Sequence, residues 1–359
     1  MKLANPVYSP SWSFSSAYDW GFTNDQLTSN LTTALTSAYK IAVLPVMCNE
    51  PTDFSYNIKA EQIDLSQFDL VLLSDIEFRS INQIREWIEK NNIQKYLLAV
   101  GGLCLNEQLE SNIIYRPWWA FNLLRFNKFQ TTYHTNKPFQ FDALLGARRP
   151  HRDYVMISFQ KNNMLDSSIV TYRDIFKGHQ VSDFCQQFET EAGVNLNYPY
   201  VSPNLKTEWE VADKLTHSIS PVVPWKIYKN TNYTILCETL ADGNTFFLSE
   251  KPTKSLYAKR IFVPFSTPNY LKNMQALGFE TFSEIFDESF DSIINPIARW
   301  KSAFDQVLYL NNQNADILYA KVAPRLEHNH NLLVNMPARI HAQMFEMLKK
   351  TVPEQYWIN

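Results

Sequence analysis

Glycine, cysteine and long apolar runs are all scarce in this chain of 359 residues, which contains only eight glycines and four cysteines. The cysteines, at positions 48, 104, 185 and 237, are too far apart for a metal-binding spacing, so we expect reduced thiols and a cytoplasmic protein. No apolar run approaches the roughly 18–20 residues that a membrane-spanning helix requires. Residues 1–6 lack the apolar core of a signal peptide. These absences argue against a membrane protein and against a disulfide-stabilised secreted one.

Net charge is also small, because 33 lysines and arginines oppose 36 aspartates and glutamates, which leaves −3. A chain with this balance has no overall electrostatic attraction to nucleic acid or to an anionic membrane. The chain is rich instead in bulky apolar side chains, with 24 phenylalanines among 45% hydrophobic residues. At this length we expect a soluble protein with two domains, each with its own core.

The first half contains a strand–helix–strand unit. Residues 68–75 and 96–101 are apolar strands, and residues 80–91 between them carry apolar side chains at helical spacing. A unit of this length is typical of a parallel sheet. Residues 40–47 predict a further buried strand, preceded by a helix from Thr23 or Asn24 to about residue 39.

Aromatic side chains gather in residues 7–22 and 115–121, which have no helical period and are predicted to be loops. Aromatic residues mostly fill cores, but in loops they can also stack on a sugar ring or on an extruded base. Both interpretations remain open here. The candidates for binding an acceptor substrate in this way are Tyr18, Trp20, Trp118 and Trp119.

Two aspartates are candidates for a catalytic base. Asp75 ends the predicted strand 68–75, and ligands of parallel α/β sheets bind beyond the carboxyl ends of the strands. Asp19 lies in the first aromatic cluster, ahead of the first predicted helix. The alternative for both is structural, because most aspartates at strand ends only cap the next turn.

Basic residues precede a helix in the second half, which we expect to begin near residue 137. Residues 139–145 predict a strand, after which Gly146, Arg148 and Arg149 lead into a helix with Pro150 near its first position. Strand–glycine–helix turns commonly bind phosphate. Residues 169–172 and 233–239 predict further strands, separated by a mostly irregular insertion.

A second helix start, after Ser249, is also loaded with cations. Ser249 is a good N-cap, and the helix is predicted to run to about residue 259 before a strand over 261–265. The positive end of a helix normally attracts acidic side chains, yet Lys251 and Lys254 both lie there. A bound phosphate would compensate them, and Glu250 is placed to accept hydrogen bonds from ribose hydroxyls. The alternative is a solvated, charged first turn.

Three further helices are predicted toward the C-terminus. The first is capped by Thr267, has Pro268 at its first position and ends at Gly278. The other two cover residues 295–310 and about 336–350.

Residues 249–254 (Ser-Glu-Lys-Pro-Thr-Lys), with the following Phe-Val-Pro-Phe and residues 270–291, resemble the nucleotide-sugar-binding domain of fucosyltransferase-like enzymes. They are still more similar to uncharacterised relatives of these enzymes in tailed bacteriophages. Residues 142–152 resemble the opening of that domain in the phage group, and the resemblance covers roughly residues 139–310.

The resemblance implies a GT-B fold, in which two Rossmann-like domains with parallel sheets face a cleft. It implies an acceptor domain over 1–137, a nucleotide-sugar-binding domain over 138–330, and a terminal helix over 331–359 that returns to the first domain. Glu250 would hold the ribose and Lys251 the diphosphate, with Arg148 or Arg149 as a second phosphate ligand and Lys254 in the same cluster. The chain has no convincing Asp-x-Asp motif, so we expect no metal and no cofactor besides the donor substrate.

The leading hypothesis is therefore a glycosyltransferase that uses a nucleoside-diphosphate sugar. Its acceptor would be a saccharide or, given the phage kinship, a hydroxymethylated base of DNA in the cytoplasm of a host cell. A carbohydrate-binding or scaffold protein that kept this fold without turnover is the alternative.

Overall fold

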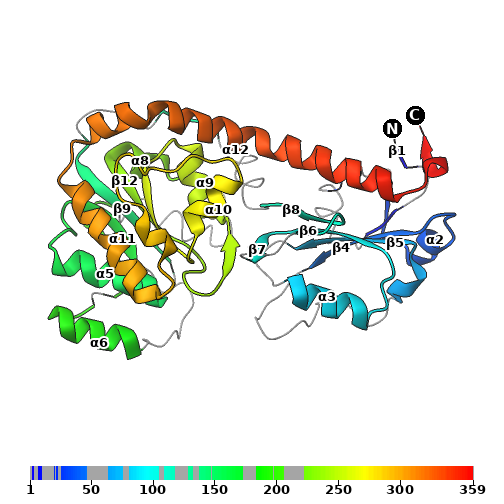
Figure 1. The fold of residues 1–359 in the computed structure, drawn as a ribbon, viewed down its shortest axis with the longest axis horizontal. Coiled ribbons are helices and arrows are strands. Elements are labelled where there is room, and N and C mark those ends of the chain that lie inside the picture. The colour runs from blue at the N-terminus through cyan, green and yellow to red at the C-terminus, as the bar shows by residue number, and fades with distance from the viewer. Residues whose placement is uncertain are drawn as a thin grey trace. The chain divides into compact units, whose positions relative to one another are not determined.

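The structure is a computed structural model of the chain, and it divides into two compact units (Figure 1). Unit 1 comprises Met1–Trp118, Thr245–Phe247 and Asn335–Asn359, and unit 2 comprises Trp119–Asn244 and Leu248–Val334. Residues described are 2–3, 7–9, 20, 22, 26–46, 64–75, 81–104, 109–117, 128–131, 137–146, 148–172, 183–196, 198–205 and 222–358. Each unit has a mainly parallel sheet with helices, so the predicted α/β class with two parallel sheets is confirmed. The functional domain boundaries stay a prediction.

Unit 1 is built on a six-stranded sheet in the order β3-β2-β4-β5-β6-β8, in which all neighbouring strands are parallel. The strands are β2 (Val7–Tyr8), β3 (Leu27–Thr28), β4 (Ile41–Val46), β5 (Leu70–Asp75), β6 (Tyr96–Val100) and β8 (Ile113–Tyr115). Every residue of β5 is buried, which explains its continuous apolar run without alternation. The predicted helix between β5 and β6 is α3 (Ile81–Lys90), so the strand–helix–strand prediction is confirmed.

The predicted helix from about residue 24 to 39 is wrong. Leu27 and Thr28 instead form β3, which pairs with Val7 and Tyr8 of β2, and among the described residues of that range the α-helix is limited to α2 (Leu31–Leu35). The side chain of Asn30 accepts from the backbone N–H of Thr33 and so begins this short helix. Pairing with a strand about twenty residues earlier therefore overrides the local helical preference.

The C-terminal end of the chain belongs to unit 1. The backbone carbonyl of Thr351 accepts from Lys95 Nζ at 2.8 Å, and the ring of Tyr356 stacks on that of Tyr39 at 5.0 Å. Two small antiparallel pairs complete the unit, β1 (Lys2–Leu3) with β15 (Trp357–Ile358) and β7 (Gly102–Cys104) with β13 (Thr245–Phe247).

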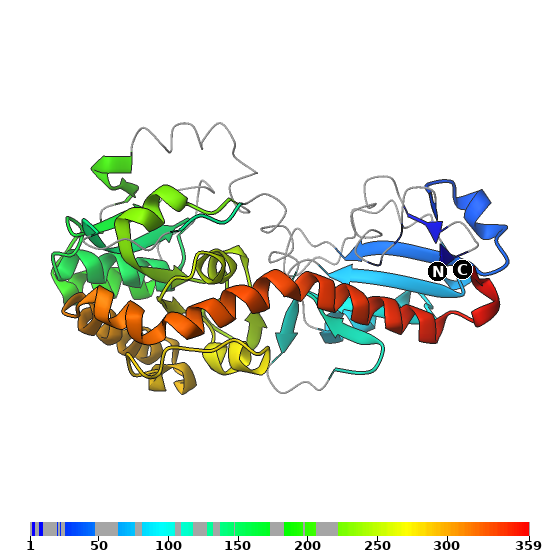
Figure 2. The ribbon, with the colours of Figure 1, turned by 90° about the horizontal axis from the view of Figure 1, so that it is seen from above.

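Unit 2 is built on a five-stranded sheet in the order β11-β10-β9-β12-β14, parallel except for β11. Figures 1 and 2 show this unit with its helices around the strands. The strands are β9 (Phe139–Leu145), β10 (Ser168–Tyr172), β11 (Tyr200–Val201), β12 (Thr231–Cys237) and β14 (Phe262–Phe265). The helices are α5 (Pro150–Lys161), α6 (Asp183–Ala192), α8 (Trp225–Asn230), α9 (Glu250–Tyr257), α10 (Tyr270–Ala276), α11 (Pro296–Asn311) and the unit 2 part of α12 (Ala315–Thr351). Helix α5 connects β9 to β10, and α9 connects β12 to β14, so both helices follow parallel strands.

Two predicted helices differ from those observed. Helix α10 begins at Tyr270 because Asn269, with φ 57°, is in the left-handed region, and the carboxylate of Asp291 caps it by accepting from the N–H groups of Leu271 and Lys272. Helix α12 begins at Ala315, well before the predicted start at about residue 336. It contains two interior prolines, which normally interrupt a helix, and for this reason its full length does not follow from local pattern.

A buried ion pair ties β9 to the turn after α9. Arg260 Nη2 lies 2.6 Å from Asp142 Oδ2, and both side chains have no exposed surface. The same carboxylate oxygen accepts from the hydroxyls of Thr231 and Thr234 on β12. Burial raises the pKa of Asp142, and the charge of Arg260 opposes this rise. The pair stabilises unit 2 only while both partners are present.

Candidate functional site

The candidate site lies in unit 2, at the carboxyl ends of the neighbouring strands β9 and β12. The turn after β9 and the turn after β12 contact each other, since Arg149 donates to the backbone carbonyl of Thr239. His151 Nε2 lies 2.9 Å from the backbone carbonyl of Glu238. Topology thus places the starts of α5 and α9 on one edge of the sheet, where α/β proteins bind ligands.

Five basic side chains come from the start of α5 and from α9, and we call them the cationic cluster: Arg148, Arg149, Arg152, Lys251 and Lys254. Lys254 was predicted at the start of α9 but lies in the last turn of this short helix. Four of them were predicted from the sequence as donor-binding residues. Arg152 was not, although it lies in the same basic run. It is only 5% exposed, and its Nη2 donates to the backbone carbonyl of Glu238 at 3.4 Å.

Helix α9 begins as predicted, because Ser249 is its N-cap and accepts from the N–H of Lys251 at 3.2 Å. The Lys251 ammonium lies 2.9 Å from Glu250 Oε1 and 3.1 Å from the hydroxyl of Thr239. Lys251 is thereby held over the turn after β12 and fixed relative to the helix start.

Glu238 connects the elements of the site. It follows β12 and is 1% exposed, and its carboxylate accepts from the N–H of Ser249, the N–H of Thr239 and the hydroxyl of Tyr270. Burial raises its pKa, and Lys251 opposes the rise. Three hydrogen-bond donors favour the ionised form, so we treat this carboxylate as a buried negative charge beneath the cationic cluster. Glu238 was not among the residues predicted from the sequence. It could have been found by its position at the end of a buried strand, which is the reason for which Asp75 was chosen in the first half.

Asp153 and His151 also affect the charge at the start of α5. Arg148 forms an ion pair with Asp153 at 3.0 Å, and its guanidinium lies 4.8 Å from the ring centre of Tyr198. Burial lowers the pKa of His151 well below its usual range, and Arg152 adds to the lowering. The imidazole is therefore neutral and does not contribute to the cationic charge.

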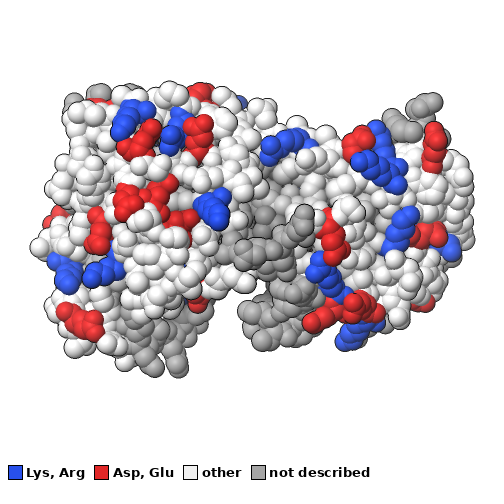
Figure 3. All heavy atoms as spheres, in the orientation of Figure 1, with Lys and Arg blue, Asp and Glu red and all other residues white. Residues whose placement is uncertain are grey.

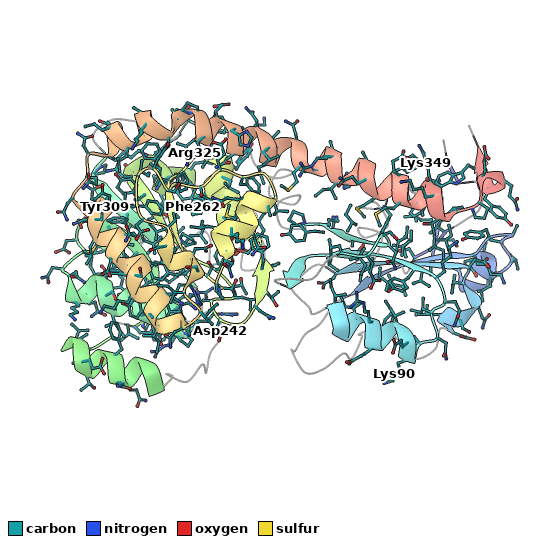
Figure 4. All side chains as sticks on the ribbon, in the orientation of Figure 1. Lys90, Asp242, Phe262, Tyr309, Arg325 and Lys349 are labelled. Carbon is teal, nitrogen blue, oxygen red and sulfur yellow. The ribbon has the colours of Figure 1, made fainter. Side chains whose placement is uncertain are left out.

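Asp242 lies in the loop after β12 (labelled in Figure 4). Burial lowers the pKa of Arg149, and the carboxylate of Asp242 opposes that lowering. A hydrogen bond from Arg299 of α11 to the backbone carbonyl of Ala241, at 2.7 Å, stabilises this loop.

Charges within α9 perturb each other strongly. Burial alone would raise the pKa of Glu250, but Lys251 and Lys254 outweigh it and the pKa is lowered. Burial lowers the pKa of the Lys254 ammonium to about 8 against the opposing carboxylate of Glu250, and Lys251 adds to the lowering. A bound anion would relieve this accumulation of positive charge.

We expect pyrophosphate binding to weaken as pH rises through about 8, because the Lys254 amine then loses its proton and one cation of the cluster is lost. Calorimetric titration with pyrophosphate between about pH 6.5 and 9.5 measures this. The Lys254→Arg variant stays charged across that range, so the pH-dependent fall should be absent from it. Pyrophosphate's own ionisation affects both proteins equally, and an identical fall in both would contradict the role of Lys254.

The acceptor-side candidates are only partly described. Asp75 is the last residue of β5, as predicted, and is fully buried. Trp20 is 1% exposed, and its Nε1 donates to the hydroxyl of Ser74 on the same strand. This is the environment of a core residue, and its role with an acceptor stays a prediction, as does catalysis by Asp75. Tyr18, Asp19, Trp118 and Trp119 lie outside the described residues.

The described residues contain neither a metal-binding group nor a membrane-spanning helix. No group of three or more histidine, cysteine, aspartate or glutamate side chains in the described part of the chain is arranged to hold a metal ion. None of the helices there is long and apolar enough to cross a membrane.

Comparisons with known proteins gave a distant structural likeness. No protein-family model matches the sequence, and no curated protein matches it. Among solved structures, the chain is similar to T4 phage BGT in complex with UDP and Mn2+, with 12% sequence identity, 97% of each chain covered and a TM-score of 0.35. At that score the likeness carries no argument about function.

Proposed function

We propose that the protein is a glycosyltransferase that moves a sugar from a nucleoside-diphosphate sugar to an acceptor hydroxyl. The observation that carries this proposal is the cationic cluster, in which the starts of α5 and α9 meet at the carboxyl ends of β9 and β12. Such an edge, with helix N-termini and basic side chains beside it, is suited to a diphosphate. The resemblance of residues 249–254 to nucleotide-sugar-binding domains supports the same donor.

The charge of the cluster fits a diphosphate that is esterified at both ends. Arg148 is neutralised by Asp153 and Lys251 by Glu250. The remaining charged side chains of the site are Arg149, Arg152 and Lys254, opposed by Glu238 and Asp242, which leaves one positive charge. The diphosphate of a nucleotide sugar carries two negative charges, so the site attracts it, and the bound donor leaves an excess of only one negative charge.

In the proposed reaction, the bond from the sugar carbon to the diphosphate breaks as the acceptor oxygen bonds to that carbon. The electron pair of the broken bond stays on the diphosphate, where Lys251 and the arginines stabilise the growing charge. The acceptor proton passes to a base, for which Asp19 and Asp75 are the proposed candidates. Glu250, whose carboxylate is kept ionised by its two lysine neighbours, would accept from the ribose hydroxyls.

A panel of nucleotide sugars, incubated singly with the protein and with saccharide or hydroxymethylated DNA acceptors, tests the proposal. We expect one donor to release its nucleoside diphosphate, and the acceptor to gain the mass of the sugar. Figure 3 shows basic and acidic side chains interspersed over the described surface on one face, so the charge there favours neither acceptor. Saturable donor binding without any release would instead support the alternative of a carbohydrate-binding protein.

Glu250→Gln separates recognition of the ribose from recognition of the phosphates. We expect it to weaken nucleoside diphosphate binding about tenfold, since a charged hydrogen bond to the ribose becomes a neutral one. Binding of free pyrophosphate, measured in the same titrations, should change little because it contains no ribose. Equal weakening of both ligands would assign Glu250 to positioning Lys251 rather than to the ribose.

A further inference from the structure

We propose that unit 2 has a second binding site, a pocket at the C-terminal end of α9 that takes a small uncharged aromatic molecule. The pocket has a volume of about 240 Å³. It is lined by Phe129, Thr131, Ala258, Lys259, Tyr319, Ala323, Leu326 and Glu327. The cationic cluster lies around the start of α9, whereas Ala258 and Lys259 follow its end, so the two sites are distinct.

The walls of the pocket suit a flat ring. Tyr319 is fixed in place, because its hydroxyl donates to the backbone carbonyl of Asn232 at 2.7 Å and accepts from the N–H of Ile261 at 3.2 Å. Phe129 is 41% exposed although it packs edge-on against the rings of Trp225 and Tyr257. Aromatic walls of this kind favour offset or edge-to-face contact with another ring.

Lys259 is a further polar residue of the lining. It follows α9 with φ 55°, in the left-handed region that commonly ends a helix, and the N–H groups of Lys259 and Arg260 donate to the carbonyls of Leu256 and Ser255. These backbone hydrogen bonds fix Lys259 at the end of α9. The Lys259 side chain lines the pocket, pairs with Glu327 and places its ammonium 4.8 Å from the ring centre of Phe129.

Polar contacts within the lining indicate a ring rather than a sugar. Lys259 and Glu327 are paired with each other, and the hydroxyl of Tyr319 is engaged on both sides by the backbone. A sugar in the pocket would have to break these contacts to satisfy its hydroxyls, whereas an apolar ring leaves them intact. The balanced charge of Lys259 and Glu327 also favours a ligand without net charge.

Indole is the probe for this site, with glucose as the comparison ligand and saturation-transfer NMR as the measurement. We expect saturable indole binding with a dissociation constant of about 1 mM or tighter, and no saturable binding of glucose. Ala323→Leu fills the pocket from the exposed face of α12 with a good helix former, and should weaken indole binding at least about tenfold. Ala276→Leu, an equivalent exposed helix position on α10, should leave it unchanged.

Melting curves of both variants establish that they are folded. Absence of indole binding to the wild-type protein, equal binding to the wild type and Ala323→Leu, or saturable glucose binding would each overturn the proposal. None of these outcomes bears on the nucleotide-sugar site, because the probe and the substituted residues lie away from the cationic cluster.

Discussion

Replacing Lys251 with alanine is expected to weaken nucleoside diphosphate binding at least about tenfold, as measured by calorimetric titration. The Lys251 ammonium is held beside Glu250 and Thr239 at the start of α9, where it can contact a phosphate without rearrangement of the helix. A charge-assisted contact of this type contributes about 1.5–3 kcal/mol. The loss should be similar for pyrophosphate, because the proposed partner is the diphosphate.

Lys259→Ala is the matched control for this variant. Lys251 lies in the first turn of α9 and Lys259 just after its last turn, and both pair with a glutamate, Lys251 with Glu250 and Lys259 with Glu327. Only Lys251 lies in the proposed donor site, so Lys259→Ala should leave nucleotide binding unchanged. The melting temperature of Lys251→Ala should change little, because the helix N-terminus disfavours the cation and favours the Glu250 carboxylate that remains. Unchanged nucleotide binding in Lys251→Ala would contradict the donor site and support the alternative, in which the start of α9 is only a solvated, charged turn.

Replacing Asp142 with alanine is expected to lower the free energy of unfolding by about 3–5 kcal/mol. Its carboxylate is the partner of Arg260, and neither side chain has exposed surface. Removal would leave the guanidinium buried without its counter-charge and would also remove the acceptor shared by Thr231 and Thr234. Denaturant titration of the purified variant measures the loss.

Glu110→Ala provides the comparison for the buried pair. Glu110 pairs with Arg85 at 2.7 Å, but the two side chains are 52% and 33% exposed. An exposed pair contributes about 0–1 kcal/mol, so this variant should be close to the wild type in stability. Similar small losses in Asp142→Ala and Glu110→Ala would show that unit 2 tolerates an unpaired Arg260, against the expectation from burial.

Much of unit 2 could be predicted because its signals are local. Ser249 caps α9, Pro150 opens α5 and the apolar runs of β9 and β14 lie within two residues of their predicted bounds. The physical determinants are a side-chain hydrogen bond to the next turn, a fixed φ angle and burial on both faces of a sheet. Each of these determinants acts over a few neighbouring residues, so each can be predicted from the sequence.

The candidate site was predicted only in part for the same reason. Four cations of the cluster stood out because they contradict the preference of a helix start for acidic residues. Arg152 and Glu238 did not stand out in the sequence. They are distinguished by their burial and by the hydrogen bond from Arg152 to the backbone of Glu238, which joins residues 86 positions apart. A buried charge is recognisable only when its partners are known.

Sequence alone determined the α/β class, the order of β9, α5, β10, β12, α9 and β14, and the two cation-rich segments, because periodicity and capping are properties of neighbouring residues. The expected irregular insertion was wrong in its described part, which contains α6, β11 and α8. Tertiary structure decided that the starts of α5 and α9 meet at one sheet edge, since this depends on the pairing of β9 with β12. It decided that Asp291 caps α10 and that Asp142 pairs with Arg260, contacts that join residues 20 and 118 positions apart. It also decided that α12 continues through two prolines, because packing along the helix outweighs the hydrogen bonds that proline removes.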